Sequence, residues 1–320
     1  MGDRKRVNVE GDRLSSLPDD LIHKILSLFA PNMPFKQVYC HPGGVSSVEL
    51  TSRGKVVQAC DERILSYAFS HNVQEVNITF LPEKKIEFPV SLFSSQSLKN
   101  LTLTGCTWRV HNLSITTPPT WELQTLATLN LHFVTLHDAN TDKGDSLFSH
   151  CANLKNLTLK HCRLVGLNGF NISHPGLSSL TLEDSSDGVN VVTPQLKNLI
   201  IKGWQGILLI SAPNLSSLHY EGSYDSLQLS TDLFHLEKVD VCLSYPSNAL
   251  KTVCLLQHFR SVKFLTLNLE IVKVCLYWSL MLSTYNSHLT VFFFSINNKR
   301  IIHTWLFFFN KRECLHESYH

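Results

Sequence analysis

The middle of this 320-residue chain repeats one short pattern of aliphatic residues. An aliphatic residue is followed by two variable positions, a second aliphatic residue, one variable position and a third aliphatic residue. The pattern occurs nine times, at residues 73–78, 98–103, 126–131, 154–159, 177–182, 196–201, 215–220, 236–241 and 262–267. Successive units begin 19 to 28 residues apart. Repeats of this period indicate a solenoid, in which each unit buries its apolar side against its neighbours.

The spacing within and between units is typical of leucine-rich repeats. Alternation of aliphatic and variable positions predicts a β-strand in each unit, with the aliphatic side chains pointing inward. We therefore predict an α/β leucine-rich-repeat solenoid over residues 73–269, with parallel strands on its concave face and an irregular or short helical convex side. The shortest units leave room for little more than a strand and a turn. Prolines that restrict the entry to a strand precede three of them, in His174-Pro175-Gly176, Thr193-Pro194-Gln195 and Ala212-Pro213-Asn214.

Side chains between the aliphatic positions are expected to point outward on the concave face. Solenoids present such extended faces to protein partners. We select as candidate target-binding residues Asn130, Thr158, Lys160, Thr181, Glu183, Lys202, His219, Glu221 and Asp240. The charges of Lys160, Glu183, Lys202 and Glu221 alternate in sign from one unit to the next. Two interpretations stay open. A partner protein recognises both the positive and the negative side chains, or the charges neutralise one another across neighbouring strands.

A short amphipathic segment precedes the repeats. Its apolar residues, at positions 21, 22, 25, 26, 28 and 29, have the spacing of a helix with one wide apolar face. Ser16 is suited to cap this helix, Pro18 fits its first turn, and Asp19 and Asp20 favour the positive end of its dipole. A helix this short is not stable alone in water, so either the rest of the chain or a partner must cover its apolar face.

The sequence Leu17-Pro18-Asp19-Asp20-Leu21-Ile22, followed by Ile25-Leu26-Ser27, closely resembles the opening of an F-box. Together with the repeats, it makes the chain similar to plant F-box/leucine-rich-repeat proteins, which often also carry a C-terminal FBD region. The resemblance implies a non-catalytic, substrate-recognition subunit of an SCF-type cullin-RING E3 ubiquitin ligase. It implies that the repeats bind a target protein, and that a Skp-type adaptor, and through it a cullin, is bound by Leu17, Pro18, Leu21, Ile22, Ile25, Leu26 and Leu28.

The second half of the F-box, which we place at residues 12–55, departs from the family pattern. Its expected helices are interrupted by Pro31, Pro34, Pro42, Gly43 and Gly44. Only residues 46–55 resemble the expected end of the module, with a glycine at position 54 where a tryptophan is typical. An alternative function is therefore a repeat module for protein–protein interaction that has lost ligase docking.

Three further segments complete the predicted organisation: a charged tail at residues 1–11, a helical connection at 56–72 and an atypical hydrophobic tail at 270–320 that does not resemble an FBD region. Residues 274–296 contain no Asp, Glu, Lys or Arg and are long enough to cross a bilayer. Polar residues interrupt the middle of that stretch, which argues against a membrane span. A genuine tail, a membrane segment and a gene-model artefact all stay open, and a membrane-tethered or extracellular receptor is a third hypothesis for function.

Composition and motifs exclude several other classes of function. A net charge of +2 without a long basic stripe argues against nucleic acid as a ligand. The nine cysteines are odd in number and form no C-x-x-C pair, which favours reduced thiols over disulfides or a metal site. The sequence contains no phosphate-binding loop, G-x-S-x-G or H-E-x-x-H motif, so we predict no catalytic residue and no cofactor. No apolar signal segment follows the first residues, which favours the cytoplasm or nucleus.

Overall fold

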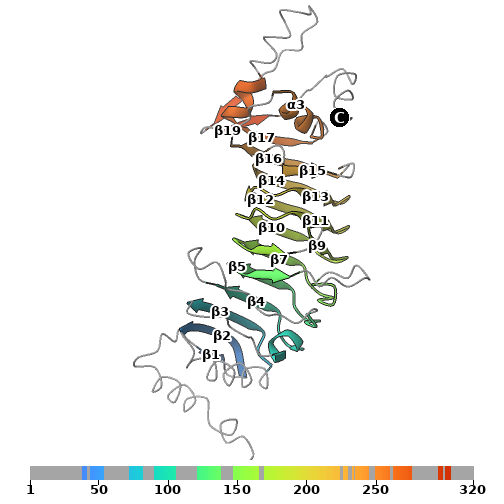
Figure 1. Ribbon diagram of the computed structural model, residues 1–320. Coiled ribbons are helices and arrows are strands. Elements are labelled where there is room, and N and C mark those ends of the chain that lie inside the picture. Colours follow the sequence, from blue (N-terminus) through green and yellow to red (C-terminus); the bar gives the residue numbers. More distant parts are fainter. Residues whose placement is uncertain are drawn as a thin grey trace, which may run out of the picture.

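The computed structural model describes residues 38–41, 44–53, 72–81, 90–105, 121–137, 147–165, 169–223, 226–229, 233, 235–244, 249–259, 262–275, 295–297 and 300–303. Its main element is a sheet of thirteen strands stacked along an elongated molecule (Figure 1). In their order across the sheet, the strands are β1 (Val38–His41), β2 (Gly44–Arg53), β3 (Glu75–Leu81), β4 (Asn100–Thr104), β5 (Thr128–His132), β7 (Asn156–Lys160), β10 (Ser179–Glu183), β12 (Asn198–Trp204), β14 (Ser217–Gly222), β16 (Lys238–Leu243), β17 (Phe264–Asn268), β19 (Arg300–His303) and β18 (Ser295–Asn297).

Each of the nine predicted repeat units supplies one strand of this long sheet, from β3 to β17, and neighbouring strands pair in parallel. The first aliphatic residue of a unit lies just before its strand, as Leu154 does, and the other two lie within the strand, as Leu157 and Leu159 do. All three are buried. The predicted leucine-rich-repeat solenoid is therefore confirmed, because the inward side chains of successive strands form one continuous apolar core.

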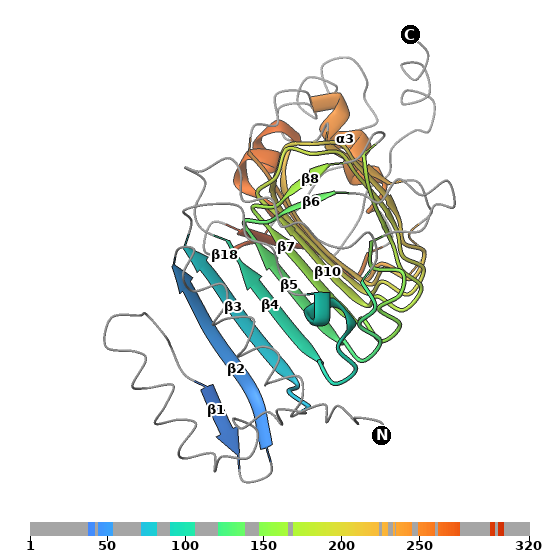
Figure 2. The ribbon, with the colours of Figure 1, turned by 60° about the horizontal axis from the view of Figure 1, so that its bottom comes forward.

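The side of the coil opposite the long sheet contains more strand than we expected. In the shortest repeats, the chain returns through a second parallel sheet, formed by β9 (Phe170–Ser173), β11 (Val189–Val192), β13 (Leu208–Ser211) and β15 (Leu227–Leu229). A smaller pair, β6 (Thr135–His137) and β8 (Arg163–Val165), precedes it. Figure 2 shows the long sheet on one side of the coil and these returning segments on the other. Alternating burial along β11 explains the strand, since Val189 and Val191 point inward.

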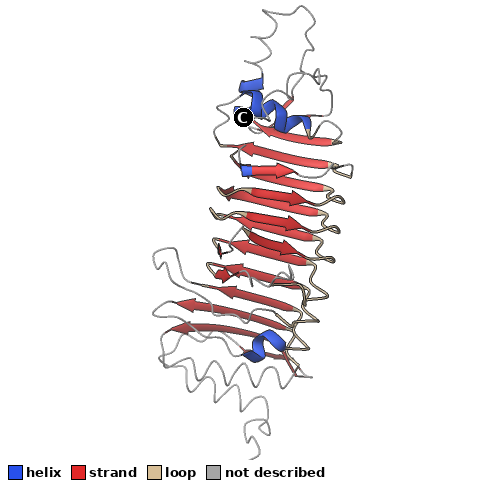
Figure 3. Cartoon of the chain, turned by 45° about the vertical axis from the view of Figure 1, so that its right-hand side comes forward, coloured by secondary structure: helices blue, strands red, loops and turns tan. Residues whose placement is uncertain are grey.

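Longer repeats contain buried aromatic side chains or helical turns between their strands. Trp121 is fully buried between Phe93 and Phe148, with ring-centroid separations of 4.8 and 5.7 Å. Phe93 belongs to the short 3-10 helix η2 (Val90–Ser94), and the helix α3 (Ala249–Gln257) lies between β16 and β17 in the sequence. Figure 3 shows that strands predominate and that the helical segments lie near the two ends of the stack.

Turns between the two sides place each strand in the same register. Pro175, Pro194 and Pro213 lie in turns before strands β10, β12 and β14, as the sequence predicted. Backbone N–H groups at positions 178 and 179 both donate to the carbonyl oxygen of Lys155, at 2.9 Å, and the equivalent pair of bonds recurs in the following repeats. The register is therefore set before each strand begins.

The two ends of the long sheet are closed by antiparallel pairings. β1 pairs with β2 at one end, and β19 pairs with both β17 and β18 at the other. Residues 295–297 and 300–303 thus contribute strands to the sheet, although they lie in the segment that we predicted as an atypical hydrophobic tail. β1 and β18 are therefore the outermost strands of the sheet in the described residues.

Strand β2 lies within residues 12–55, where we predicted an F-box with a degenerate second half. We expected residues 46–55 to be the end of a helical module, whereas Gly44–Arg53 pairs in parallel with β3, from Ser47 opposite Glu75 to Arg53 opposite Leu81. The physical reason is an alternation of apolar and polar residues, because Val48 and Leu50 are buried in the core while Ser47 and Thr51 are half-buried. Residues 12–37, and residues 56–71 of the helical connection that we predicted at 56–72, lie outside the described residues.

In the ranges that the structure describes, no helix is both long and apolar enough to cross a membrane. Residues 274–296 are the uncharged stretch that is long enough to cross a bilayer, and most of it, residues 276–294, lies outside those ranges.

Candidate protein-binding surface

The predicted outward residues form two straight rows across the long sheet. In the central row, Asn130 pairs with Thr158, Thr158 with Thr181, and His219 with Asp240. Ile200 lies between Thr181 and His219 in this row. Each of these residues is half-buried, because its side chain packs beside those of the neighbouring strands. The strand pairing therefore brings five of the nine candidate target-binding residues into one line.

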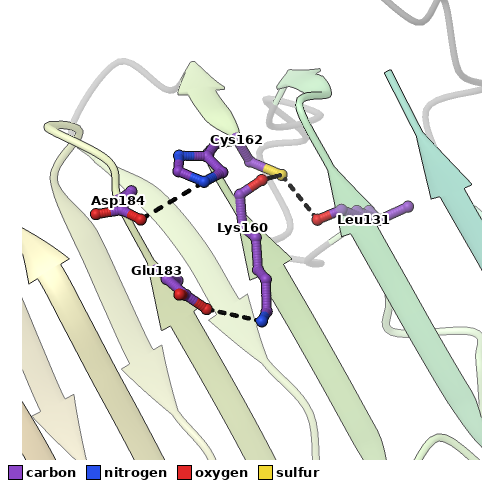
Figure 4. Close-up of polar contacts among 6 residues, drawn as sticks. Leu131, Lys160, Cys162, Glu183 and Asp184 are labelled. Carbon is purple, nitrogen blue, oxygen red and sulfur yellow. Dashed lines mark hydrogen bonds and ion pairs between the residues drawn. The ribbon is translucent and has the colours of Figure 1, made fainter. Parts of the chain in front are cut away.

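The second row, one outward position further along each strand, holds the other four candidates. Lys160 lies opposite Glu183, Glu183 opposite Lys202, and Lys202 opposite Glu221. Of these, Lys160 and Glu183 form an ion pair, with 2.8 Å between Nζ and Oε2 (Figure 4). The hydrogen bond from Lys160, together with the charges of Lys160 and Lys202, holds the pKa of Glu183 below its usual value. Neutralisation, one of our two interpretations, thus applies to Lys160 and Glu183, whereas Glu221 forms no ion pair within the described residues.

Side-chain hydrogen bonds connect parts of the central row. The Asn130 amide donates to the Thr102 hydroxyl at 3.3 Å. His219 Nδ1 lies 3.1 Å from Asp240 Oδ2, and both side chains are less than one quarter exposed. Within the described residues, His219 Nε2 is buried and has no hydrogen-bond partner. An imidazole whose Nδ1 faces a carboxylate is held in one orientation, so its Nε2 position is fixed as well.

A third line of residues, which the sequence analysis missed, begins where the strands of the second row end. Phe133, His161 and Asp184 directly follow β5, β7 and β10, and each has a positive φ, of 56°, 50° and 54°. The Phe133 and His161 rings are stacked, with centroids 4.5 Å apart and planes 9° apart. His161 Nε2 lies 3.5 Å from Asp184 Oδ2 (Figure 4). No sequence signal for this line was visible apart from Gly203, which occupies the equivalent position in the next repeat.

Burial separates the groups of this region into structural and accessible ones. Desolvation, reinforced by the charge of Lys160, lowers the pKa of His132. Burial raises the pKa of the Cys162 thiol to about 12, and its Sγ donates to the carbonyl oxygen of Leu131 at 3.2 Å (Figure 4). Cys162 is therefore an inert core residue, whereas the neighbouring His161 side chain is 43 % exposed.

The outward face offers hydrogen-bonding and ionic side chains. Within the described part of the chain, no group of three or more His, Cys, Asp or Glu side chains is arranged to hold a metal ion. Polar groups on a rigid parallel ladder are suited to contact another macromolecule over several repeats. The seven predicted adaptor-binding residues, from Leu17 to Leu28, lie outside the described residues.

Comparison with known proteins places the repeats in a family. The family model described as "FBD-associated F-box protein At5g56370, LRR repeats" matches residues 62–276. The chain is 26 % identical to the F-box/FBD/LRR-repeat protein At3g52680 of Arabidopsis thaliana over 247 residues, which are 62 % of this chain and 52 % of that protein. It is 32 % identical to the F-box/LRR-repeat protein At3g26922 of the same plant over 136 residues, 40 % of this chain and 42 % of that protein.

A third relative, the putative FBD-associated F-box protein At1g55030 of Arabidopsis thaliana, is 26 % identical over 161 residues, 48 % of this chain and 36 % of that protein. The chain thus spans about half or less of the length of these relatives. No solved structure matches it significantly. The family match covers the repeats from β3 to β17 and agrees with the resemblance inferred from the sequence. On the basis of that match, the chain belongs to the plant family of leucine-rich-repeat regions found in FBD-associated F-box proteins.

Proposed function

We propose that this chain is the substrate-recognition subunit of an SCF-type cullin-RING E3 ubiquitin ligase. In this proposal, the outward face of the long sheet binds a target protein, and the segment from Leu17 to Leu28 docks on a Skp-type adaptor and through it on a cullin. The in-register rows of polar residues across the long sheet are the observation that carries the target-binding part. The docking part is supported by the Leu-Pro-Asp-Asp-Leu-Ile sequence and by the F-box names of the relatives.

The proposed role is non-catalytic and needs no cofactor. Ubiquitin transfer belongs to the partner ligase, while the receptor raises the effective concentration of the target near it. The proposed place of action is the cytoplasm or the nucleus. The partner bound by the face is a protein rather than nucleic acid, because cations and carboxylates alternate along the second row and no basic stripe exists there for phosphates.

A second candidate function is a repeat module that binds a target but no longer docks on a ligase. Strand β2 favours it, because residues 44–53 are part of the repeat sheet and are not available for the later helices of an F-box. A partial docking module buries less apolar surface on the adaptor, so the costs of association weigh more heavily against binding.

Co-purification of the full-length chain with a Skp-type adaptor decides between the two candidates. The receptor proposal expects a stable complex that is lost in the Leu21→Asp/Ile25→Asp variant, since both residues belong to the apolar face of the predicted helix. The matched control is His23→Asp/Ser27→Asp, which adds the same two charges to the opposite face and should retain the adaptor. Failure of the intact chain to bind the adaptor, while it still binds a target, supports the second candidate.

The target-binding part requires its own test. Proteins captured by the full-length chain should be compared, by quantitative mass spectrometry, with those captured by Thr158→Arg/Thr181→Arg, which places two bulky cations in the central row. The control is Leu209→Arg/Gln228→Arg, which adds the same charges to exposed positions of the back sheet. We expect specific partners to be lost from the first variant only. Equal loss from both variants, or from neither, contradicts the proposal.

A further inference from the structure

The rim line, which we define as Phe133, His161, Asp184 and Gly203, joins four successive repeats at one edge of the outward face. All four residues have a left-handed backbone, with φ between 50° and 58°. The N–H groups of Phe133, His161 and Asp184 donate to the carbonyl oxygens of Lys160, Glu183 and Lys202, at 2.8 to 2.9 Å. The ladder between the strands thus continues by one more hydrogen bond at each of these three residues.

Glycine adopts this conformation freely, and Gly203 demonstrates that the rim accommodates it. A left-handed backbone is unfavourable for an L residue with a side chain, above all for a bulky one such as phenylalanine. Backbone strain of this kind is concentrated at functional sites in proteins. Among the three, Phe133 carries the most unusual conformation, because histidine and aspartate adopt the left-handed backbone more readily than phenylalanine does.

These three side chains form a continuous group that is accessible to solvent. Phe133 is half-buried beneath the stacked His161 ring, and the side chains of His161 and Asp184 are 43 % and 45 % exposed. Asp184 Oδ1 lies above Gly203, where a Cβ atom would be only 2.1 Å away. The absence of a side chain at Gly203 thus makes room for the Asp184 carboxylate at the end of the line.

The carboxylates of Glu183 and Asp184 differ in their cationic partners. Glu183 is paired with Lys160 at 2.8 Å and lies opposite Lys202 in the second row. For Asp184, the one polar side-chain contact within the described residues is that with His161, at 3.5 Å. Asp184 is therefore an accessible carboxylate beside a stacked pair of rings. Within the described residues no Lys or Arg side chain pairs with it, so it has capacity for a cationic partner.

We propose that the rim line binds an arginine side chain of the target protein. A guanidinium group is planar, packs against aromatic and imidazole rings, and donates paired N–H groups to a carboxylate. A lysine ammonium matches the carboxylate but not the ring pair. This inference rests on the proposed function of the outward face as a target-binding surface, and it adds the chemistry of one essential contact.

The test uses peptides selected from a phage-displayed random heptapeptide library on the full-length chain. We expect arginine to be enriched in the binders, and we expect the dissociation constant of each synthesised binder to rise at least tenfold for Asp184→Asn, a change of about 1.4 kcal/mol. Asparagine tolerates the left-handed backbone well, so this variant removes the charge and keeps the local conformation. Replacement of the peptide arginine by lysine should weaken binding to the wild type by at least about fivefold, through the lost ring and bidentate contacts.

Two controls separate recognition from a purely structural role of the line. Glu237→Gln removes an exposed carboxylate that pairs with Lys263, just before β16 at the opposite ends of the strands, and should leave peptide affinity unchanged. Phe133→Gly relieves the backbone strain, so the protein should keep its urea midpoint and yet lose peptide affinity. A large fall in the midpoint without a change in affinity would assign Phe133 a structural role and overturn the proposal.

The outcomes also distinguish this inference from the proposed function. If binders are lost with Thr158→Arg/Thr181→Arg but carry no enriched arginine, or tolerate Asp184→Asn, the arginine site is wrong and the target-binding face stands. If no peptide is selected, or none responds to substitution on the outward face, both proposals are contradicted.

Discussion

The carboxylate of Asp184 occupies the space that a side chain at Gly203 would need. A Cβ atom at position 203 would lie 2.1 Å from Asp184 Oδ1, and the backbone there has a φ of +58°. Both features require glycine, one through sterics and the other through backbone conformation. The contact joins the end of one repeat to the end of the next.

Gly203→Ala is therefore expected to lower the free energy of unfolding by about 1 to 3 kcal/mol, through backbone strain and displacement of the Asp184 side chain. Urea denaturation followed by circular dichroism measures the change. Gly188→Ala is the matched control, because its backbone is not left-handed and a Cβ atom there meets nothing closer than 3.8 Å. We expect that control to stay within about 0.5 kcal/mol of the wild type, and equal losses in the two variants would contradict the steric account.

His174 is expected to make the repeat region less stable in mild acid. It is 1 % exposed, its Nε2 donates to the carbonyl oxygen of Cys151 at 3.0 Å, and its Nδ1 accepts from the backbone N–H of Gly176 at 3.1 Å. Burial is the main reason why the pKa of His174 is lowered. The unfolded chain therefore binds a proton at a higher pH than the folded chain does. The contribution of His174 to the free energy of unfolding is therefore fully present above about pH 6.5 and decreases as the pH falls below that value.

His174→Gln should reduce the difference between the urea midpoints at pH 7.5 and pH 5.5, because the glutamine amide does not titrate. Part of the difference should remain, since burial also lowers the pKa of His132. The control is His137→Gln, at an exposed position of β6, which should leave the pH dependence as it is. An unchanged pH dependence in His174→Gln would show that the stability loss arises elsewhere.

The buried thiols are expected to resist alkylation in the folded protein. Burial raises the pKa of Cys151 to about 11 and that of Cys162 to about 12. At pH 8 both therefore carry almost no thiolate, which is the reactive form. Iodoacetamide labelling followed by peptide mass spectrometry should modify the half-buried Cys242 before either of them, and urea should abolish the difference. Early labelling of Cys162 in native protein would refute its core position.

Trp121 is expected to tolerate phenylalanine far better than alanine. It is fully buried between Phe93 and Phe148, and its indole N–H has no hydrogen-bond partner within the described residues. Trp121→Ala should lose about 3 to 5 kcal/mol of stability, because it leaves a large cavity. Trp121→Phe keeps an aromatic ring and removes a desolvated N–H group, so its loss should stay below about 1.5 kcal/mol. Similar urea midpoints for the two variants would contradict this packing.

The sequence predicted those parts of the fold that depend on repetition. Alternating aliphatic residues located all nine strands, and equal spacing within the units predicted that Thr158 and Thr181, or Lys160 and Glu183, lie side by side. The reason is physical: a parallel strand has a side-chain period of two, and in-register pairing carries that period from one repeat to the next. Whether these residues bind a target stays a prediction.

Features that depend on single positions were not visible in the same way. The left-handed backbone at Phe133 and His161 has no local sequence signal, so the rim line required the structure. Strand β2 was missed because its Ser-Ser-Val-Glu-Leu sequence was matched to a helical motif, although Val48 and Leu50 alternate as in a strand. The back sheet was missed because strands as short as β11, with four residues, are hard to separate from turns in a sequence.

The parallel pairing from β2 to β17 also sets how the outward side chains of this solenoid are spaced. Neighbouring strands lie about 4.8 Å apart, so each row presents one side chain per repeat at a constant interval. Backbone hydrogen bonds and buried leucines hold the interval, and the outward side chains do not. A substitution at one outward position therefore changes one side chain while its neighbours keep their places, so the composition of this face can change one residue at a time without a change of the backbone.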